Sequence, residues 1–354
     1  MGDTLRVGLV GIGNISRQYL DTFPRLPGVS LVAAADLDPS RSVPGVRLLR
    51  PAELYAADDV DLVLNLTIPA AHAEVALAAI ASGKHVYGEK PLALSTSEGR
   101  EVLASAATAG VRVGCAPDTV LGTGTQTTRH CLDTGTIGTP VAATAFMVTP
   151  GHEHWHPDPE FYYRPGGGPL FDMGPYYLTA LVTLLGPVRR VTGLASTPRA
   201  SRVIGSGPRA GTEFPVAVRT HVAGVLEHEN GALTTLMMSF DVHAATLPRI
   251  EVYGTDGSLS VPDPNTFDGE VRVHTPGGDW APVPASAGYE NAGRGIGVAD
   301  LAAAVAADTA HRANAEVAYH VLDVMESLLR AAETGVAQAV ESTCDRPAPV
   351  TRAC

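Results

Sequence analysis

The sequence has 354 residues, enough for two domains of ordinary size, each with its own core. Its formal net charge is −12 and it has no run of Lys and Arg, which argues against nucleic acid as a direct partner. No segment reaches the roughly 18 apolar residues of a membrane span, and none of the four cysteines forms a CxxC pair, so no disulfide framework or zinc site is indicated. We therefore expect a soluble, cytoplasmic protein.

The N-terminal segment predicts a strand, a glycine turn and a helix. Residues 5–10 form a short apolar run, residues 11–16 read GIGNIS, and a helical pattern follows to about residue 23. Gly11 allows the tight turn and Gly13 lets the backbone approach a pyrophosphate, while Ser16 replaces the usual third glycine. We expect a dinucleotide to bind this turn, at Gly11, Ile12, Gly13, Asn14 and Ile15.

A second predicted strand, residues 29–35, ends at Asp36, 23 residues after Gly13. A carboxylate at this point accepts hydrogen bonds from the ribose hydroxyls and repels a 2′-phosphate. The sequence therefore predicts NAD rather than NADP as the cofactor.

The turn after the next predicted strand, residues 62–66, faces the same sheet edge. It reads TIPAAH, and we expect Thr67, Ile68 and Pro69 to contact the cofactor. His72 starts the following helix, where capping of the backbone and a place beside the nicotinamide both remain open.

Residues 86–91, VYGEKP, predict the centre of the site. His85 to Gly88 is expected to be an inner strand of a parallel sheet, with Glu89 and Lys90 at its carboxyl end, where such sheets bind ligands. Pro91 disfavours the α region for Lys90, so we expect an extended turn with the lysine side chain directed outwards. The alternative is an exposed loop salt bridge between Glu89 and Lys90.

Aromatic and histidine residues are concentrated in residues 151–168, although the chain is only 5% aromatic. They are His152, His154, Trp155, His156, Phe161, Tyr162 and Tyr163, with Arg164 beside them. Aromatic rings with polar edges suit the CH faces and hydroxyls of a sugar or cyclitol, whereas the alternative is a small core under a long loop. The three alternating histidines would face one side of a strand and could bind a metal, but Pro157 would interrupt that strand, and we predict no metal site.

The glycine-rich run GGGPLFDMGPYY, residues 166–177, is predicted to lead into an apolar helix at residues 178–185. Asp172 and Tyr176 then lie at a helix N-terminus, where Asp172 is either functional or an N-cap. From residue 188 the pattern changes to strands, two of them joined at Asn230-Gly231 by a two-residue hairpin turn. This predicts a largely antiparallel sheet, whose open face is a candidate subunit interface, together with alanine-rich helices at residues 295–306 and 316–332.

In order and spacing, GIGNIS, Asp36, TIPAAH, GEKP and GGGPLFDMGPYY resemble the glucose–fructose oxidoreductase, inositol dehydrogenase and rhizopine-catabolism (Gfo/Idh/MocA) family over essentially the whole chain. The resemblance implies an α/β fold with an N-terminal Rossmann domain and a C-terminal α/β domain that has a large open, mostly antiparallel mixed sheet. We predict an NAD-binding domain at 1–116, a substrate-binding and oligomerisation domain at 117–341, and a loose tail at 342–354. A homodimer or homotetramer is implied.

The resemblance also implies the chemistry, which is hydride transfer between a nicotinamide and a hydroxyl or ketone carbon of a sugar, glycoside or cyclitol. Lys90 matches the catalytic lysine of the EKP motif and Asp172 the acid of the DxGxH motif, but Tyr176 stands where the family often has histidine. A phenol is a poor base near pH 7 unless a nearby ammonium lowers its pKa. The hypothesis is a Lys90/Tyr176 acid–base pair oriented by Asp172.

Beyond these catalytic residues, the predicted cofactor contacts include His72, Glu89 and Lys90 in addition to the residues named above. The predicted substrate-binding residues are Asp118, His154, Trp155, His156, Tyr162, Tyr163, Arg164, Asp172 and Tyr176. Two other functions stay open: glycoside cleavage through transient NAD-dependent oxidation, and a non-catalytic sensor of NAD or sugar like the family's galactose-regulon repressor.

Overall fold

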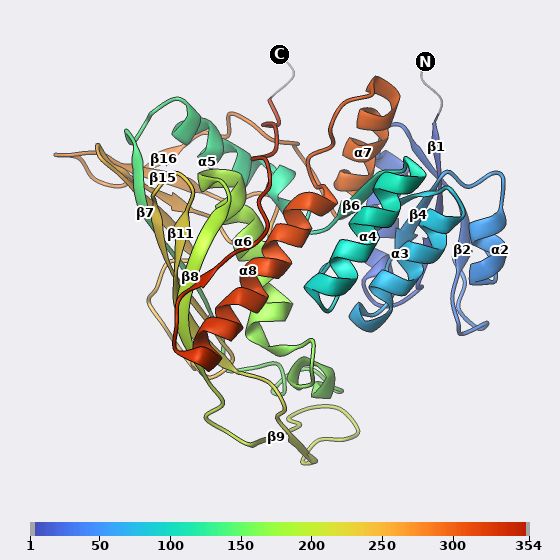
Figure 1. The fold of residues 1–354 in the computed structure, drawn as a ribbon, viewed down its shortest axis with the longest axis horizontal. Helices are drawn as coiled ribbons and strands as arrows, with labels where there is room; N and C mark the ends of the chain where they lie inside the picture. The colour runs from blue at the N-terminus through green and yellow to red at the C-terminus, as the bar shows by residue number, and fades with distance from the viewer. Residues whose placement is uncertain (1–3, 352–354) are drawn as a thin grey trace. The chain divides into compact units, whose positions relative to one another are not determined.

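The computed structural model describes residues 4–351, which fold into two compact units (Figure 1). The first unit runs to Gly122 and includes Tyr289–Leu322, and the second comprises Thr123–Gly288 and the chain from Asp323 onwards. The chain therefore returns to the first unit through residues 289–322, which the predicted domain limits had assigned to the second domain. Cys354 lies outside the described residues.

The first unit contains a six-stranded sheet in the order β3-β2-β1-β4-β5-β6. All neighbouring strands are parallel, and the order reverses between β1 and β4, so the carboxyl ends of β1 and β4 mark a topological switch point. This confirms the predicted parallel sheet and the inner position of β5. The strands are β1 (Leu5–Val10), β2 (Val29–Ala35), β3 (Arg47–Leu49), β4 (Leu62–Asn65), β5 (His85–Gly88) and β6 (Val113–Cys115).

Helices cover this sheet, and α3 and α4 lie side by side on it (Figure 1). The start of α4 follows directly from sequence, because Ser95 and Glu98 form a capping box, and Gly110 ends the helix with a φ of +66°. The helices of the unit are α1 (Ser16–Thr22), α2 (Pro51–Ala56), α3 (His72–Ala81), α4 (Thr96–Ala109) and α7 (Ile296–Ala307), with 3-10 turns η1 (Phe23–Arg25), η2 (Pro69–Ala71) and η3 (Thr119–Leu121).

The second unit contains a nine-stranded sheet in the order β16-β15-β14-β13-β7-β12-β11-β8-β17. Only β7 and β12 run parallel among these neighbours, which confirms the predicted large, mostly antiparallel mixed sheet. The strands are β7 (Pro140–Val148), β8 (Val188–Ser196), β11 (His221–His228), β12 (Leu233–Ser239), β13 (Ile250–Gly254), β14 (Ser258–Val261), β15 (Val271–His274), β16 (Ala281–Val283) and β17 (Gln338–Ala339); β9 (Ser201–Val203) and β10 (Glu213–Pro215) form a separate hairpin.

One face of this large sheet is covered by helices (Figure 1). They are α5 (Thr123–Asp133), α6 (Gly168–Leu185) and the second half of α8 (Ala315–Thr334), while the 3-10 turn η4 spans Glu160–Tyr163. Side chains alternate accordingly: Val222, Leu226 and Leu236 are buried under the helices, and Leu194 and Leu233 on the opposite face are exposed. The sheet is therefore half-solvated within the unit.

The predicted two-residue turn at Asn230-Gly231 is wrong. Glu227 pairs with Leu233, and His228 N–H donates to Ala232 O, which leaves three residues in the turn. A two-residue type I′ turn needs positive φ at both central residues, and here only Gly231 has it, at +88°. Asn230 instead accepts a hydrogen bond from Ala232 N–H and donates one to Leu185 O, which fixes the longer turn.

The segment predicted to be a loose tail is instead bonded along the second unit as far as the structure describes it. Ser342 N–H donates to Asp323, Arg346 pairs with Asp133 at 2.6 Å, and Val350 N–H donates to a buried Gln126 side chain. The partners in these contacts are single side chains in other parts of the sequence, so no local sequence pattern predicts that the segment is ordered. Within residues 4–351, no helix is both long and apolar enough to cross a membrane.

Candidate functional site

The glycine turn after β1 is shaped by two glycines with different surroundings. Gly11 has a φ of +96°, and a Cβ on it would lie 2.7 Å from the carbonyl carbon and oxygen of Leu66, so only glycine fits between β1 and β4. Over Gly13, by contrast, no atom lies within 4 Å of the Cβ position. Among the described residues, none accepts a hydrogen bond from the backbone N–H groups of residues 13–15. The N–H and the hydroxyl of Ser16, by contrast, both donate to Gly13 O. Open space beside free N–H groups fits a pyrophosphate.

Asp36 lies beside this turn at the carboxyl end of β2. Its carboxylate accepts hydrogen bonds from Ile12 N–H at 2.7 Å and Asp38 N–H at 2.8 Å, and Arg41 lies 3.5 Å away. The backbone thus fixes a mostly buried carboxylate next to the open space over Gly13. The residues present fit an NAD molecule with its pyrophosphate on the turn and a ribose on Asp36.

His72 is buried at the start of α3, where its ring bridges two turns of the site. Nδ1 lies 2.6 Å from Pro91 O and Nε2 lies 3.0 Å from Thr67 O. Burial lowers the pKa of His72, against the opposing effect of these two carbonyls. The contacts are those of a structural bridge between the turns after β4 and β5, and contact with the cofactor stays a prediction.

Glu89 is buried directly after β5. Its carboxylate accepts hydrogen bonds from the Tyr19 hydroxyl at 2.8 Å and from Lys90 N–H at 3.0 Å. The alternative of an exposed salt bridge is therefore wrong for Glu89. The carboxylate acts inside the unit, tying the Lys90 turn to α1.

Asp118 is fully buried, and it accepts hydrogen bonds from two backbone N–H groups. Its Oδ2 accepts hydrogen bonds from Gly295 N–H at 2.8 Å and Gly297 N–H at 3.1 Å, at the start of α7. Burial raises the pKa of Asp118 to about 6, while Arg294 and the two N–H groups oppose that rise. These contacts anchor a helix, and the predicted contact with substrate stays a prediction.

In the second unit, Asp172 and Tyr176 lie within α6, which begins at Gly168, ten residues before the predicted start. The reading of Asp172 as an N-cap is therefore wrong. Gly168 has a φ of +82°, and Pro169 follows in the first helical turn, where its fixed φ and missing N–H are tolerated. Residues four apart lie on one face of a helix, so α6 presents Asp172 and Tyr176 together.

The structure adds His152, which the sequence indicated only as part of the aromatic and histidine segment or as one of three possible metal ligands. His152 Nε2 lies 2.9 Å from Asp172 Oδ2. The ring of His152 packs edge-on to Tyr162, with ring centroids 4.1 Å apart, and against Phe240 at 4.6 Å. Twenty residues separate His152 from Asp172, so only the fold brings them together.

The alternating histidines do not share a strand face, because residues 151–159 form turns. His154 is exposed near Glu153, and His156 accepts a hydrogen bond from Asp158 N–H through Nδ1. Within residues 4–351, no group of three or more His, Cys, Asp or Glu side chains is placed to hold a metal ion. The strand on which the metal alternative depended is absent from this segment.

The aromatic segment has an exposed part and a buried anchor. Trp155 and Phe161 are 61% and 52% exposed, and Phe161 packs against Tyr162 with ring centroids 4.0 Å apart. Tyr163, predicted to bind substrate, is instead fully buried and donates a hydrogen bond to Glu153. The exposed rings offer a surface on which a sugar can stack.

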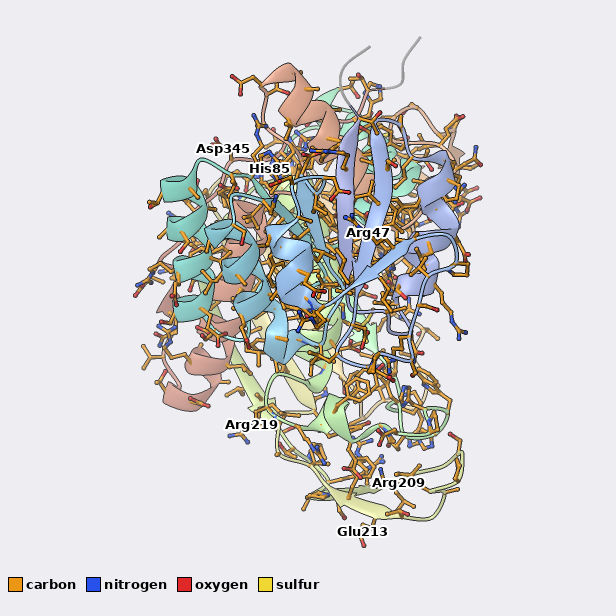
Figure 2. All side chains as sticks on the ribbon, turned by 90° about the vertical axis from the view of Figure 1, so that its right-hand side faces the viewer. Arg47, His85, Arg209, Glu213, Arg219 and Asp345 are labelled. Atoms are coloured by element: carbon orange, nitrogen blue, oxygen red, sulfur yellow. The ribbon has the colours of Figure 1, made fainter. Side chains whose placement is uncertain are left out.

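An ion-pair network ties this segment to the β9–β10 hairpin. Arg202 on β9 pairs with Glu153 and with Asp241, each at 2.6 Å, and the three side chains are at most 9% exposed. Arg209, in the connection between β9 and β10 (Figure 2), pairs with Asp158 at 2.8 Å and with Glu160. Arg164 also pairs with Glu160. The predicted substrate-binding segment is thus held by charges at both of its ends.

Comparison with known proteins identifies the family. Residues 5–116 match the model described as oxidoreductase family, NAD-binding Rossmann fold, and residues 125–260 match that of the GFO/IDH/MocA C-terminal domain. The chain belongs to the Gfo/Idh/MocA family. Its first unit is the NAD-binding domain of an oxidoreductase, which confirms the predicted cofactor and enzyme class.

Two relatives show how similar individual members of the Gfo/Idh/MocA family are to this chain. A 1,5-anhydro-D-fructose reductase from Ensifer adhaerens is 28% identical over 268 residues, 72% of this chain and 74% of that protein. An inositol 2-dehydrogenase from Ralstonia nicotianae is 33% identical over 150 residues, 39% of this chain and 44% of that protein.

Solved structures share the fold. An NAD-binding oxidoreductase from Klebsiella pneumoniae superposes with a TM-score of 0.82 at 24% identity, covering 95% of this chain and 99% of its own. Levoglucosan dehydrogenase in complex with NADH and levoglucosan gives 0.80 at 20% identity, covering 95% and 99%. At these identities the similarity establishes the architecture of both units.

Proposed function

We propose that this protein is an NAD-dependent dehydrogenase or reductase that transfers a hydride between the nicotinamide and a hydroxyl or carbonyl carbon of a sugar, glycoside or cyclitol. The observation that carries the proposal is the position of Lys90, which follows β5 at the same sheet edge as the glycine turn and Asp36. Relatives named for an anhydro sugar and for inositol support a polyhydroxy substrate.

Asp36 supports NAD over NADP. The carboxylate is held in place by two backbone N–H groups, so it does not swing aside to admit a 2′-phosphate. Arg41, the cation nearest to Asp36, lies 3.5 Å from both Asp36 and Asp38, which offset its positive charge. We expect the protein to bind NADH more tightly than NADPH.

The residues proposed to handle the proton are Lys90, Asp172 and Tyr176. NAD, when bound, supplies the hydride acceptor or donor. The Lys90 ammonium holds the substrate oxygen and stabilises negative charge on it, while Asp172 orients a proton-accepting group in the second unit. The exposed rings of Trp155 and Phe161, with His154, His156 and Arg164 nearby in sequence, would hold the CH faces and hydroxyls of the substrate.

The test is a screen of polyols, sugars, glycosides and their keto forms with NAD(H) and NADP(H). Nicotinamide absorbance reports net oxidation or reduction, and mass spectrometry of the products reports cleavage that leaves the absorbance unchanged. We expect an absorbance change with NAD or NADH. Cleavage without net NADH formation would instead indicate redox-assisted glycoside hydrolysis, and tight ligand binding with no product of either kind would indicate a sensor.

We also propose that the helix-free face of the nine-stranded sheet joins two copies of the chain. Leu194, Val225 and Leu233, on the adjacent strands β8, β11 and β12, are 72%, 38% and 48% exposed on this face. The backbone register places Leu194 opposite Ala223 and Val225 opposite Thr235, so the side chains share one face. An apolar patch of this kind on a soluble protein marks an interaction surface.

A further inference from the structure

His152 and Asp172 form a partly buried pair that none of the sequence motifs predicts. Nε2 and Oδ2 are 2.9 Å apart, a hydrogen-bond distance, and the two side chains keep only 14% and 15% of their surface exposed. Asp172 belongs to the DxG part of a motif whose histidine is replaced here by Tyr176. In the structure, the imidazole that contacts Asp172 therefore comes from His152 and not from position 176.

The ring of His152 is held in one orientation from three sides. Tyr162 contacts it edge-on, Phe240 packs at a centroid distance of 4.6 Å, and Trp155 lies at 5.4 Å. The backbone is fixed too, because His152 N–H donates to the Tyr163 hydroxyl, which is itself bonded to Glu153. A ring held in this way retains its geometry during a reaction without a further loss of side-chain entropy.

The partner of Nε2 determines where the proton of a neutral ring lies. An ionised carboxylate only accepts hydrogen bonds, so Nε2 must carry the N–H that faces Asp172. Nδ1 then carries the lone pair, and none of residues 4–351 donates a hydrogen bond to it. A carboxylate that fixes one ring nitrogen and leaves the other basic is the arrangement of a general base.

We propose that His152 is the general base of this enzyme, with Asp172 as its orienting group and Tyr176 as a hydroxyl donor to the substrate oxygen. The inference rests on the proposed function. Nδ1 takes the hydroxyl proton, the O–H electron pair becomes the second C–O bond, and the hydride leaves the same carbon for oxidised NAD. Asp172 stabilises the imidazolium that forms, and the ring returns the proton in the reducing direction.

Imidazole suits this step better than the phenol of Tyr176. A phenol with an ordinary pKa near 10 is almost entirely protonated at pH 7. Tyr176 is itself buried, with 5% of its surface exposed. An imidazole exchanges protons near neutral pH. The imidazole of His152 can therefore take the role that the motif histidine, replaced here by Tyr176, would otherwise have.

The first test needs neither cofactor nor substrate. Nitrogen-15 NMR of the histidine-labelled protein distinguishes the two ring tautomers, and the His152 signals are identified by their loss in His152→Gln. We expect a neutral ring with the proton on Nε2. In Asp172→Asn an amide N–H can face Nε2, so a shift of the proton to Nδ1 is expected. A wild-type ring protonated on Nδ1 would overturn the proposal.

The second test uses chemical rescue. His152→Ala should lower kcat by about a hundredfold or more, the usual scale of general acid–base catalysis, and imidazole in the buffer should restore part of it. NADH binding, followed by NADH fluorescence, should not change. His130→Ala is the matched control, because His130 is exposed on α5 and takes no part in the proposed reaction.

The outcomes separate the two proposals. Wild-type turnover in His152→Ala, or a loss that imidazole leaves unchanged in a variant that binds NADH normally, overturns the role of His152 while hydride transfer stands. A wild-type enzyme with no turnover on any polyhydroxy compound overturns the proposed function itself.

Discussion

Glu89 and Lys90 are neighbours in the chain but have different environments. The Glu89 side chain is buried and bonded to Tyr19 and to the Lys90 backbone, so it fixes the turn that carries the lysine. Its carboxylate is occupied by two donors and is unsuited to exchange a proton with substrate. The EKP motif thus divides into a structural acid and a residue that we propose to be catalytic.

Lys90→Met is the direct test of that division. Methionine keeps a similar length but has no ammonium, so kcat should fall by about a hundredfold or more while NADH still binds. Lys84→Met provides the matched control, because Lys84 is the only other lysine of the chain and its Nζ donates to Ala57 O. Near-normal turnover of Lys90→Met would rule out a catalytic role of the Lys90 ammonium at the substrate oxygen, as would an equal loss in the control.

Whether the role of a residue could be predicted from the sequence depends on how far along the chain its partners lie. Lys90 and Asp36 each follow a strand directly, so the strand pattern alone placed them at the ligand-binding edge. The His152–Asp172 pair joins a loop to a helix interior, and alternation suggested a strand that the loop does not form. The buried roles of Asp118 and Tyr163 likewise depend on distant partners, Gly295 and Glu153.

In the N-terminal strand–turn–helix, the two glycines of the turn serve different purposes: one allows close packing and the other leaves space for a ligand. Gly11 is required by the protein's own packing, since β1 and the end of β4 leave no room for a side chain. Gly13 is required by nothing in the protein, since the space above it is open. The two glycines should therefore differ in what their replacement destroys.

Gly11→Ala should destabilise the protein by at least about 1–2 kcal/mol, because alanine is strained at positive φ and its methyl group would clash with Leu66. Gly13→Ala should unfold like wild type but bind NADH about tenfold or more weakly, since a methyl group keeps the pyrophosphate off the backbone. Thermal unfolding without cofactor and NADH titration measure the two effects. Equal stability of both variants would contradict this division.

The start of α7 is another element with a testable energetic signature. Asp118 accepts two N–H groups there, yet its burial raises its pKa to about 6, above the value near 3.9 of an unfolded chain. Between about pH 4 and pH 6, the folded state therefore holds a proton that the unfolded state has released. The stability contributed by this group is largest below pH 4 and falls as the pH rises to 6.

Asp118→Asn should remove this fall, because asparagine keeps an acceptor oxygen for the Gly295 and Gly297 N–H groups and has no charge to bury. We expect the wild type to lose about 2–3 kcal/mol more stability than the variant between pH 4 and pH 7. Urea unfolding of both proteins at the two pH values measures the difference. Identical pH dependence in the two proteins would mean that Asp118 titrates normally.

Elements with a strong local signal were predicted, and those without one were missed. The apolar strands of the first unit were predicted with ends that match the structure or differ from it by one residue. The three-residue strands β3, β9, β10 and β16 are too short to show a period. For α6, the available signal was Pro169, a residue that is favoured in the first turn of a helix, but the neighbouring glycines indicated a loop.

At the scale of the whole molecule, the chain passes between its two units three times, at residues 122/123, 288/289 and 322/323. The predicted limit between residues 116 and 117 lies six residues before the first crossing. The other two are invisible in sequence, because α7 and α8 have ordinary alanine-rich helical patterns whichever unit they join. The family resemblance supplied the architecture of each unit, and the contacts supplied which segments belong to it.

The open face of the nine-stranded sheet yields the last prediction. A stable pair of copies buries roughly 1,200–2,000 Å² in total, and the patch around Leu194 would supply the apolar centre of the interface that we propose. Leu194→Asp should convert the proposed dimer, or a tetramer built from it, into smaller species, because a carboxylate in that centre would have no partner to offset its desolvation. Sedimentation equilibrium at several protein concentrations measures the change.

Leu247→Asp is the control, since Leu247 is also an exposed leucine but lies in a loop outside the sheet. Its assembly should match wild type, and NADH binding should be the same in both variants because Gly13 and Asp36 belong to the other unit. A wild-type protein that is monomeric at micromolar concentration would exclude the interface. A Leu194→Asp variant that assembles like wild type would move the interface to another surface, because a buried, unpaired charge at the centre of the sheet contact is incompatible with unchanged affinity.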